Sequence, residues 1–137
     1  MIGETNVTIV GNLTADPDLR FTPSGVAVAT VTVASTPRIY DRQSSKWRDS
    51  DTLFLRATVW REAAQQAADS LRRGDRVVVV GYLKQRTFED KEGIKRTVVE
   101  VEADEIAASL RYATVAITRA GIPAAEEAAA GHGHPLQ

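Results

Sequence analysis

The sequence predicts an all-β fold, a small barrel or sandwich of several strands with one short helix. Three observations lead to this prediction. Short apolar runs rich in Val, Thr and Ile are bounded by Gly, Pro, Asn and Asp, a pattern typical of strands. In one stretch, residues 63–71, the apolar residues instead recur at helical spacing. The 137 residues, 43% of them hydrophobic, suffice for a single domain with an ordinary core.

The strands are expected in a simple order along the chain. The first two cover residues 7–13 and 26–35, and the third covers residues 52–60. Between the second and third, residues 38–51 are polar but contain Tyr40 and Trp47, which indicates an extended hairpin loop. Residues 76–87 and 95–104 form a further hairpin around a turn at residues 90–93.

The helix is expected between the third and fourth strands, where apolar residues recur at helical spacing: Ala63, Ala64, Ala67, Ala68 and Leu71. Arg72 and Arg73 favour its C-terminal end, and Gly74 stops it. After Leu110, weak alternation permits one more short strand. Beyond Ala120 the chain is rich in Ala, Gly and Pro, so residues 1–120 form the domain and residues 121–137 are expected to be a disordered tail.

Composition narrows the class of protein. The 17 Lys and Arg balance 18 Asp and Glu, so any contact with nucleic acid depends on local charge rather than on the net charge of −1. The absence of cysteine excludes disulfides and thiolate metal sites. No apolar run is long enough to cross a bilayer, and Met1 opens onto polar residues, so we expect a cytoplasmic protein.

Alternation assigns two faces to the third strand. The core face carries Leu53, Leu55, Ala57 and Val59, and the opposite face carries Phe54, Arg56, Thr58 and Trp60. The fourth strand repeats this pattern, with Tyr82, Lys84, Arg86 and Phe88 opposite a face of Val77, Val79, Gly81 and Leu83. Aromatic rings interleaved with cations suit a nucleic-acid single strand, because bases stack on rings and phosphates meet the positive charges.

Other interpretations of these residues remain open. Phe54 and Trp60 could instead pack against a second subunit or under a loop, and for Tyr82 we favour a structural role. Glu100, Glu102 and Asp104 share a predicted strand face, which suits either a divalent-cation site or a solvated edge strand. His132-x-His134 lacks a third ligand nearby, so an inert tail is favoured. We expect no metal, no cofactor and no catalytic site.

Several ordered motifs together match one family: Val10-Gly11-Asn12-Leu13, Asp16-Pro17, Leu19-Arg20-Phe21, Pro23-Ser24-Gly25 and Leu71-Arg72-Arg73-Gly74. On these motifs the chain resembles the bacterial single-stranded DNA-binding proteins over roughly residues 5–118. The resemblance implies an OB-fold, a five-stranded barrel with one short helix and long β-hairpins. It also implies a homotetramer. The segment from Leu110 to Thr118 is similar to an extra C-terminal strand that clamps two subunits together in one subfamily.

The resemblance also implies which residues bind DNA. The base-stacking aromatics correspond to Tyr40, Phe54, Trp60 and Phe88, with Trp47 beside them. The backbone-tracking cations are expected to be Arg38, Arg56, Lys84 and Arg86, with Lys46 and Arg48 as further candidates. The family usually ends in an acidic tip finishing in Pro-Phe, whereas this sequence ends His134-Pro135-Leu136-Gln137, which puts recruitment of replication and repair proteins in doubt.

The sequence therefore predicts a non-enzymatic protein that binds and protects single-stranded DNA in replication, recombination and repair, without marked sequence preference. Two alternatives stay open. The same barrel could serve as an accessory subunit for protein contacts, which the missing acidic tip favours. A nuclease would need carboxylates facing the aromatic groove, for which Glu100, Glu102 and Asp104 are the candidates.

Overall fold

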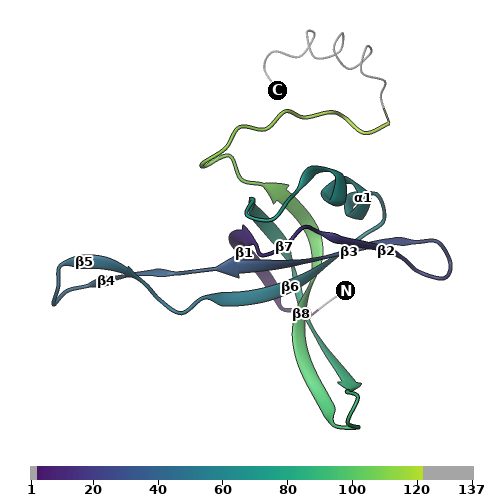
Figure 1. Ribbon diagram of the computed structural model, residues 1–137, viewed down its shortest axis with the longest axis horizontal. Coiled ribbons are helices and arrows are strands. Elements are labelled where there is room, and N and C mark those ends of the chain that lie inside the picture. Colours follow the sequence, from purple (N-terminus) through teal and green to yellow (C-terminus); the bar gives the residue numbers. More distant parts are fainter. Residues whose placement is uncertain (1–2, 122–137) are drawn as a thin grey trace.

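The computed structural model describes residues 3–121, in which eight strands and one helix follow one another. Figure 1 shows their arrangement. In chain order they are β1 (Asn6–Leu13), β2 (Asp18–Phe21), β3 (Ala27–Ser35), β4 (Arg38–Asp41), β5 (Lys46–Asp49), β6 (Leu53–Trp60), α1 (Arg61–Ser70), β7 (Arg76–Glu89) and β8 (Lys95–Ala108). Within residues 3–121, no helix is long and apolar enough to span a membrane.

Five strands close into a ring in the order β1, β7, β8, β6 and β3. The ring closes because β1 pairs antiparallel with β7 along most of its length and then with β3 at Asn12 and Leu13. The contact between β6 and β8 is parallel. Strand β2 adds a sixth, outer strand beside β3.

The core lies inside this ring and consists mainly of valine and alanine. The largest fully buried side chains are Val31, Val33, Val77, Val79 and Val101, which come from β3, β7 and β8. Alternate residues of β3 are buried along the whole strand, as expected for one face of a sheet that packs inward. Helix α1 contributes buried Ala64 and Ala67 and covers one end of the ring.

Two hairpins extend beyond the ring (Figure 1). Strands β4 and β5 pair as a separate two-stranded sheet between β3 and β6. Strands β7 and β8 are 14 residues each, and their outer halves form the second arm. These two arms present side chains that the core does not cover.

The predicted strands, helix and hairpins are confirmed with small changes in their limits. The helix ends where expected: the Nη1 of Arg72 donates to the carbonyl oxygens of Ala68 and Leu71. Strand β2 was not predicted, because four residues between two turns carry little periodicity. Leu53 is exposed (54%) rather than in the core, since it begins β6 outside the closed part of the ring.

The predicted extra C-terminal strand does not form in the single chain, and its pairing with a second subunit stays a prediction. Between Ser109 and Gly121 the described chain contains no strand, because a strand needs a paired neighbour and none lies beside this segment. Figure 1 shows it leaving β8 and passing above the ring and α1 without joining the sheet. The predicted disordered tail, apart from Gly121, and the His132–His134 pair lie outside the described residues.

Candidate nucleic-acid interface

The outer face of β6 carries the first part of the predicted surface. Phe54, Arg56 and Trp60 are exposed on this strand, while Ala57 and Val59 are buried on its other face. The alternation follows directly from strand geometry, in which successive side chains point to opposite faces. The β6 sequence therefore places two rings and a guanidinium on one outer face.

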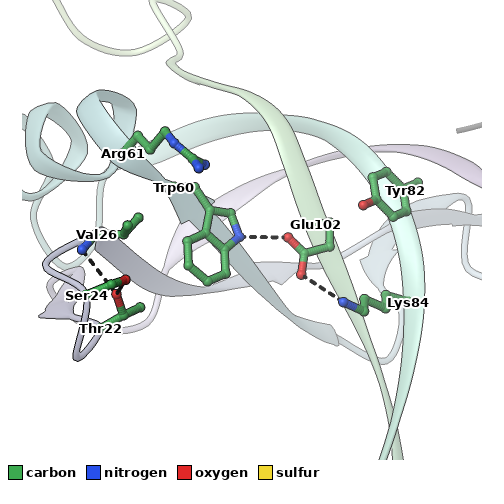
Figure 2. A pocket seen from close by; sticks show the side chains of 8 residues that line it. All are labelled: Thr22, Ser24, Val26, Trp60, Arg61, Tyr82, Lys84 and Glu102. Atoms are coloured by element: carbon green, nitrogen blue, oxygen red, sulfur yellow. Dashed lines mark hydrogen bonds and ion pairs between the residues drawn. The ribbon is translucent and has the colours of Figure 1, made fainter.

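Trp60 lies at the end of β6, where the chain turns into α1, and the residue is 39% exposed. Its indole Nε1 donates a hydrogen bond of 2.9 Å to the Glu102 carboxylate, which holds the ring in one orientation. The ring borders an open pocket (Figure 2). The other lining residues are Thr22, Ser24, Val26, Arg61, Tyr82, Lys84 and Glu102.

Strand β7 supplies the second part of the surface. Lys84, Arg86 and Phe88 are all exposed along its outer half. The Arg86 guanidinium carbon lies 4.9 Å from the centre of the Phe88 ring, a cation–π contact. The Arg86 guanidinium and the Phe88 ring thus form one surface on which a base could stack.

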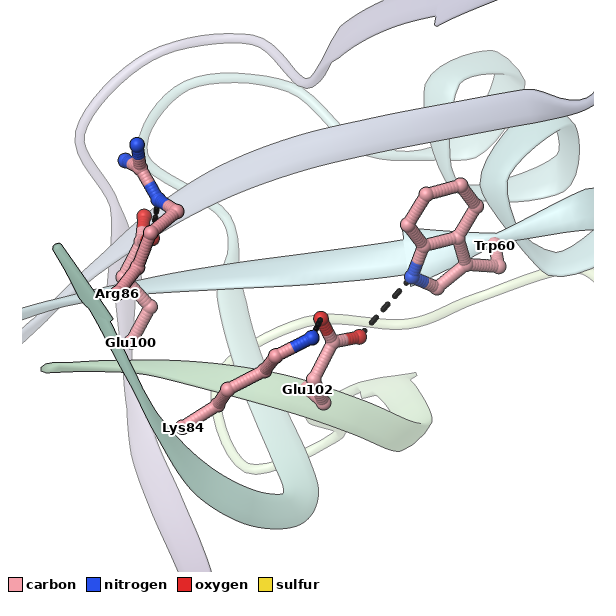
Figure 3. Close-up of polar contacts among 5 residues, drawn as sticks. All are labelled: Trp60, Lys84, Arg86, Glu100 and Glu102. Atoms are coloured by element: carbon pink, nitrogen blue, oxygen red, sulfur yellow. Dashed lines mark hydrogen bonds and ion pairs between the residues drawn. The ribbon is translucent and has the colours of Figure 1, made fainter. Parts of the chain in front are cut away.

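Strand β8 lies between β6 and β7 and places two carboxylates in the centre of the surface (Figure 3). Glu100 meets the Nε of Arg56 at 3.3 Å and the Nε of Arg86 at 2.8 Å. Glu102 binds the indole of Trp60 and lies 3.8 Å from the Lys84 ammonium. These contacts unite residues from β6 and β7 that are far apart in the sequence.

The β4–β5 hairpin carries the third part. Tyr40 and Trp47 are directly opposite one another, with ring centres 5.4 Å apart in an edge-to-face arrangement. Arg38 forms an ion pair of 3.8 Å with Asp49 on the paired strand. Lys46 and Arg48 are also exposed on this hairpin.

The structure thus brings Arg56, Trp60, Lys84 and Arg86 together around two glutamates, with Phe88 in contact with Arg86. Arg38, Tyr40 and Trp47 form a separate group on the β4–β5 arm, which extends away from the β7–β8 arm (Figure 1). Phe54 is exposed on β6, paired with Ala34 of β3.

Sequence reasoning missed Arg61, Thr22 and Ser24, which line the pocket beside Trp60. Arg61 is the first residue of α1, where a positive charge opposes the helix dipole. Its φ of 62° lies in the left-handed region, which is unfavourable for arginine. The unfavourable charge at a predicted helix start was the one available signal. Thr22 and Ser24 carry no sequence signal for a binding site, because hydroxyl residues are common in turns.

Comparison with known proteins places these features in a family. The model of the Single-strand binding protein family matches residues 4–109. The chain belongs to this family.

Relatives within the family cover most of the chain. The single-stranded DNA-binding protein of Mycobacterium tuberculosis (strain H37Rv) is 67% identical over 120 residues, which span 88% of this chain and 73% of the relative. The single-stranded DNA-binding protein 2 of Streptomyces coelicolor is 60% identical over 119 residues, covering 87% of this chain and 60% of that protein.

A solved structure agrees with the fold. The crystal structure of the small single-stranded DNA-binding protein from Streptomyces coelicolor superposes with a TM-score of 0.68 at 35% identity, covering 80% of this chain and 97% of that chain. The closed five-stranded ring with its short helix is therefore the OB-fold that the family resemblance implied.

Membership of a family of binding proteins settles the nuclease alternative: the chain is not an enzyme. The three carboxylates predicted on one face of this strand, Glu100, Glu102 and Asp104, do not form a group that could hold a metal ion. A bulge places Ala103 opposite Gly81 and Glu105 opposite Val80, so Asp104 has no partner in the ladder and the alternation breaks there. Within residues 3–121, no three acidic or histidine side chains are grouped to hold a metal ion.

Proposed function

We propose that this family member binds and protects single-stranded DNA during replication, recombination and repair, processes that expose unpaired strands, and that it does so without marked sequence preference. The observation that carries the proposal is the outer surface of β6 and β7, where exposed rings alternate with cations. The relatives named as single-stranded DNA-binding proteins support it. A protein with this function works beside the chromosome, in the bacterial cytoplasm.

The mechanism is base stacking combined with phosphate neutralisation. Every base offers a flat π-face, so stacking on Trp60, Phe54 or Phe88 is independent of sequence and contributes about 1–3 kcal/mol per base. Arg56, Lys84 and Arg86 are exposed beside these rings and can approach the phosphates. Duplex bases are already stacked on one another, so the surface selects single strands.

The β4–β5 hairpin extends the proposed path. Its Tyr40–Trp47 pair offers a further aromatic platform, and Arg38, Lys46 and Arg48 supply cations around it. The arm lies beyond the ring, so a strand that crosses β6 and continues onto the hairpin would contact both groups (Figure 1). One chain can therefore engage several successive nucleotides.

Tryptophan fluorescence provides the test, because Trp47 and Trp60 both lie on the proposed surface and the chain has no other tryptophan. Titration with poly-thymidine should quench the emission to saturation, and a duplex of equal length should not. The affinity should fall with added salt, because phosphate contacts release counterions. Absence of quenching and of binding would contradict the proposal and favour a role for the same surface in protein contacts.

We also propose that the chain assembles as a homotetramer in which the segment from Leu110 to Thr118 clamps two subunits together. Leu110, Tyr112, Val115 and Ile117 are exposed in the isolated chain, an unusual number of apolar side chains for 8 consecutive positions of a free segment. Pairing with a second copy would cover them and provide the neighbour that a strand requires.

Light scattering tests this assembly. The unmodified chain should have the mass of four copies, and Ile117→Arg should lower that mass, because a charge would be placed in the interface. Ile117→Val is the matched control and should leave the mass unchanged. A monomer before substitution, or a tetramer that tolerates the arginine, would contradict the proposed clamp.

A further inference from the structure

The cations that β6 and β7 contribute to the proposed interface, Arg56, Lys84 and Arg86, are already paired within the protein. Arg56 and Arg86 both contact Glu100, and Lys84 contacts Glu102. Three cations thus face two carboxylates, which leaves one positive charge in excess on this part of the surface. Figure 3 shows Glu100 next to Arg86, and Glu102 between Lys84 and Trp60.

The two carboxylates lie deeper than the cations that they bind. The Glu100 and Glu102 side chains are 17% and 21% exposed, whereas those of Arg56, Lys84 and Arg86 are 51–62% exposed. A DNA strand that reached these cations would therefore pass above the glutamates. Its phosphates would approach the same N–H groups and experience repulsion from the two fixed negative charges.

The Nε of Arg86 shows how Glu100 and a DNA phosphate would compete for the same donor. It donates a hydrogen bond of 2.8 Å to Glu100, so this N–H cannot donate to a phosphate unless the contact breaks. The Arg56 Nε forms a longer ion pair, 3.3 Å, with the other oxygen of Glu100. A phosphate that binds these guanidinium groups therefore either displaces Glu100 from Nε or binds the Nη groups beside a fixed negative charge.

We propose that Glu100 and Glu102 are built-in competitors of the DNA backbone, which lower the affinity for single strands and speed their release. The inference rests on the proposed function and concerns the regulation of the same surface. A protein that coats DNA must also be removed from it, and a carboxylate poised to recapture each cation makes release faster.

The proposal predicts that removing the charge of either glutamate raises the affinity for single-stranded DNA. Exposed ion pairs contribute little individually, so we expect each neutralised glutamate to raise the affinity about two- to fivefold. The dependence on salt should become steeper, by a slope of about one for each carboxylate, because phosphates then meet cations with no internal partner.

The experiment compares Glu100→Gln, Glu102→Gln and the double variant with the unmodified protein. Glutamine keeps the shape of each side chain, and at position 102 it retains an oxygen that can accept the Trp60 indole hydrogen bond. Glu105→Gln is the matched control, because it removes the same charge from the same strand, at an exposed residue opposite Val80 on the far side of the bulge. Affinity and release rate are measured on oligothymidine at two salt concentrations.

We expect the first three variants to bind more tightly and to dissociate more slowly, while Glu105→Gln stays within about a factor of 1.5 of the unmodified protein, as for a remote surface charge. Unchanged or weaker binding by folded Glu100→Gln and Glu102→Gln would overturn the inference, as would an equal gain in Glu105→Gln. If the unmodified protein itself fails to bind, the proposed function fails instead, so the two results are distinguishable.

Discussion

Trp60 lies at a junction of the fold and also presents an aromatic ring at the proposed interface. It closes β6, precedes the first residue of α1, and presents a partly exposed ring held by the Glu102 carboxylate. A ring that is fixed before the ligand arrives loses little conformational freedom on binding. The hydrogen bond therefore favours stacking by Trp60 over stacking by an unrestrained side chain.

Substitution Trp60→Ala should weaken binding to oligothymidine by about 1–3 kcal/mol through the loss of one stacked base. The fold should persist, because the ring is partly exposed and outside the valine core. Trp60→Phe is the control that keeps a ring but loses the Nε1 donor, and it should retain most of the affinity. Titration with oligothymidine measures the affinity, and circular dichroism checks the fold. An unfolded Trp60→Ala would instead assign the ring to the core.

Arg61 should show backbone strain that its neighbours lack. With φ of 62°, a side chain at this position is strained, and glycine avoids the strain. We expect Arg61→Gly to be about 1 kcal/mol more stable to urea than Arg61→Ala, although both variants lose the same charge. Equal stabilities would show that the position is not strained. Both should bind single strands less tightly than the unmodified protein.

At the scale of elements, the β7–β8 arm depends on its turn. Asp90 accepts hydrogen bonds from the Nε of Arg96 and from the backbone N–H groups of Ile94 and Glu92. The Arg96 contact is the main cause that lowers the pKa of the Asp90 carboxyl, followed by the Ile94 N–H; desolvation opposes them and the Glu92 N–H adds to them. The charged carboxylate therefore stabilises the turn that orients this arm.

The pH dependence of this turn has a predictable sign. Because the pKa of Asp90 is lower in the folded state, its stabilisation is complete above the ordinary aspartate value of about 3.9 and is lost as the pH falls through the folded value. Amide signals of Glu92 and Ile94, followed by nuclear magnetic resonance, should titrate below that ordinary value. In Asp90→Asn this titration should be absent. A titration at or above the ordinary value would contradict the assignment.

At the scale of the whole molecule, two glycines allow neighbouring backbones to approach closely. A Cβ at Gly11 would overlap the carbonyl oxygen of Ala34, across the β1–β3 contact that closes the ring. A Cβ at Gly81 would overlap the carbonyl oxygen of Glu102, at the bulge between β7 and β8. Backbone atoms cannot move aside as a flexible side chain can.

Gly81→Ala should therefore destabilise the fold by about 3 kcal/mol, the upper part of the range for overpacking. Gly93→Ala is the control: it has open space around the added methyl group and a φ of 78°, so the strain should cost about 1 kcal/mol. Urea unfolding of both variants provides the comparison. Equal losses of unfolding free energy in the two variants would show that the close backbone approach at Gly81 does not exclude a side chain there.

Much of this fold and surface could be predicted from the sequence, because the relevant signals are local. The period of two in β6 and β7 separates the core from the exposed rings and cations, and the helical period marks α1. Every residue predicted for DNA binding is exposed, from Arg38 to Phe88, although the contact with DNA itself stays a prediction.

Tertiary structure decided what depends on partners distant in the chain. Only folding brings Glu102 to Trp60, 42 residues away, and Glu100 to both Arg56 and Arg86. The bulge that leaves Asp104 without a partner on β7 and the outer strand β2 likewise arise from pairing between strands. A sequence specifies the face of each strand through its own alternation, whereas the charge balance of the surface depends on which strands lie next to one another.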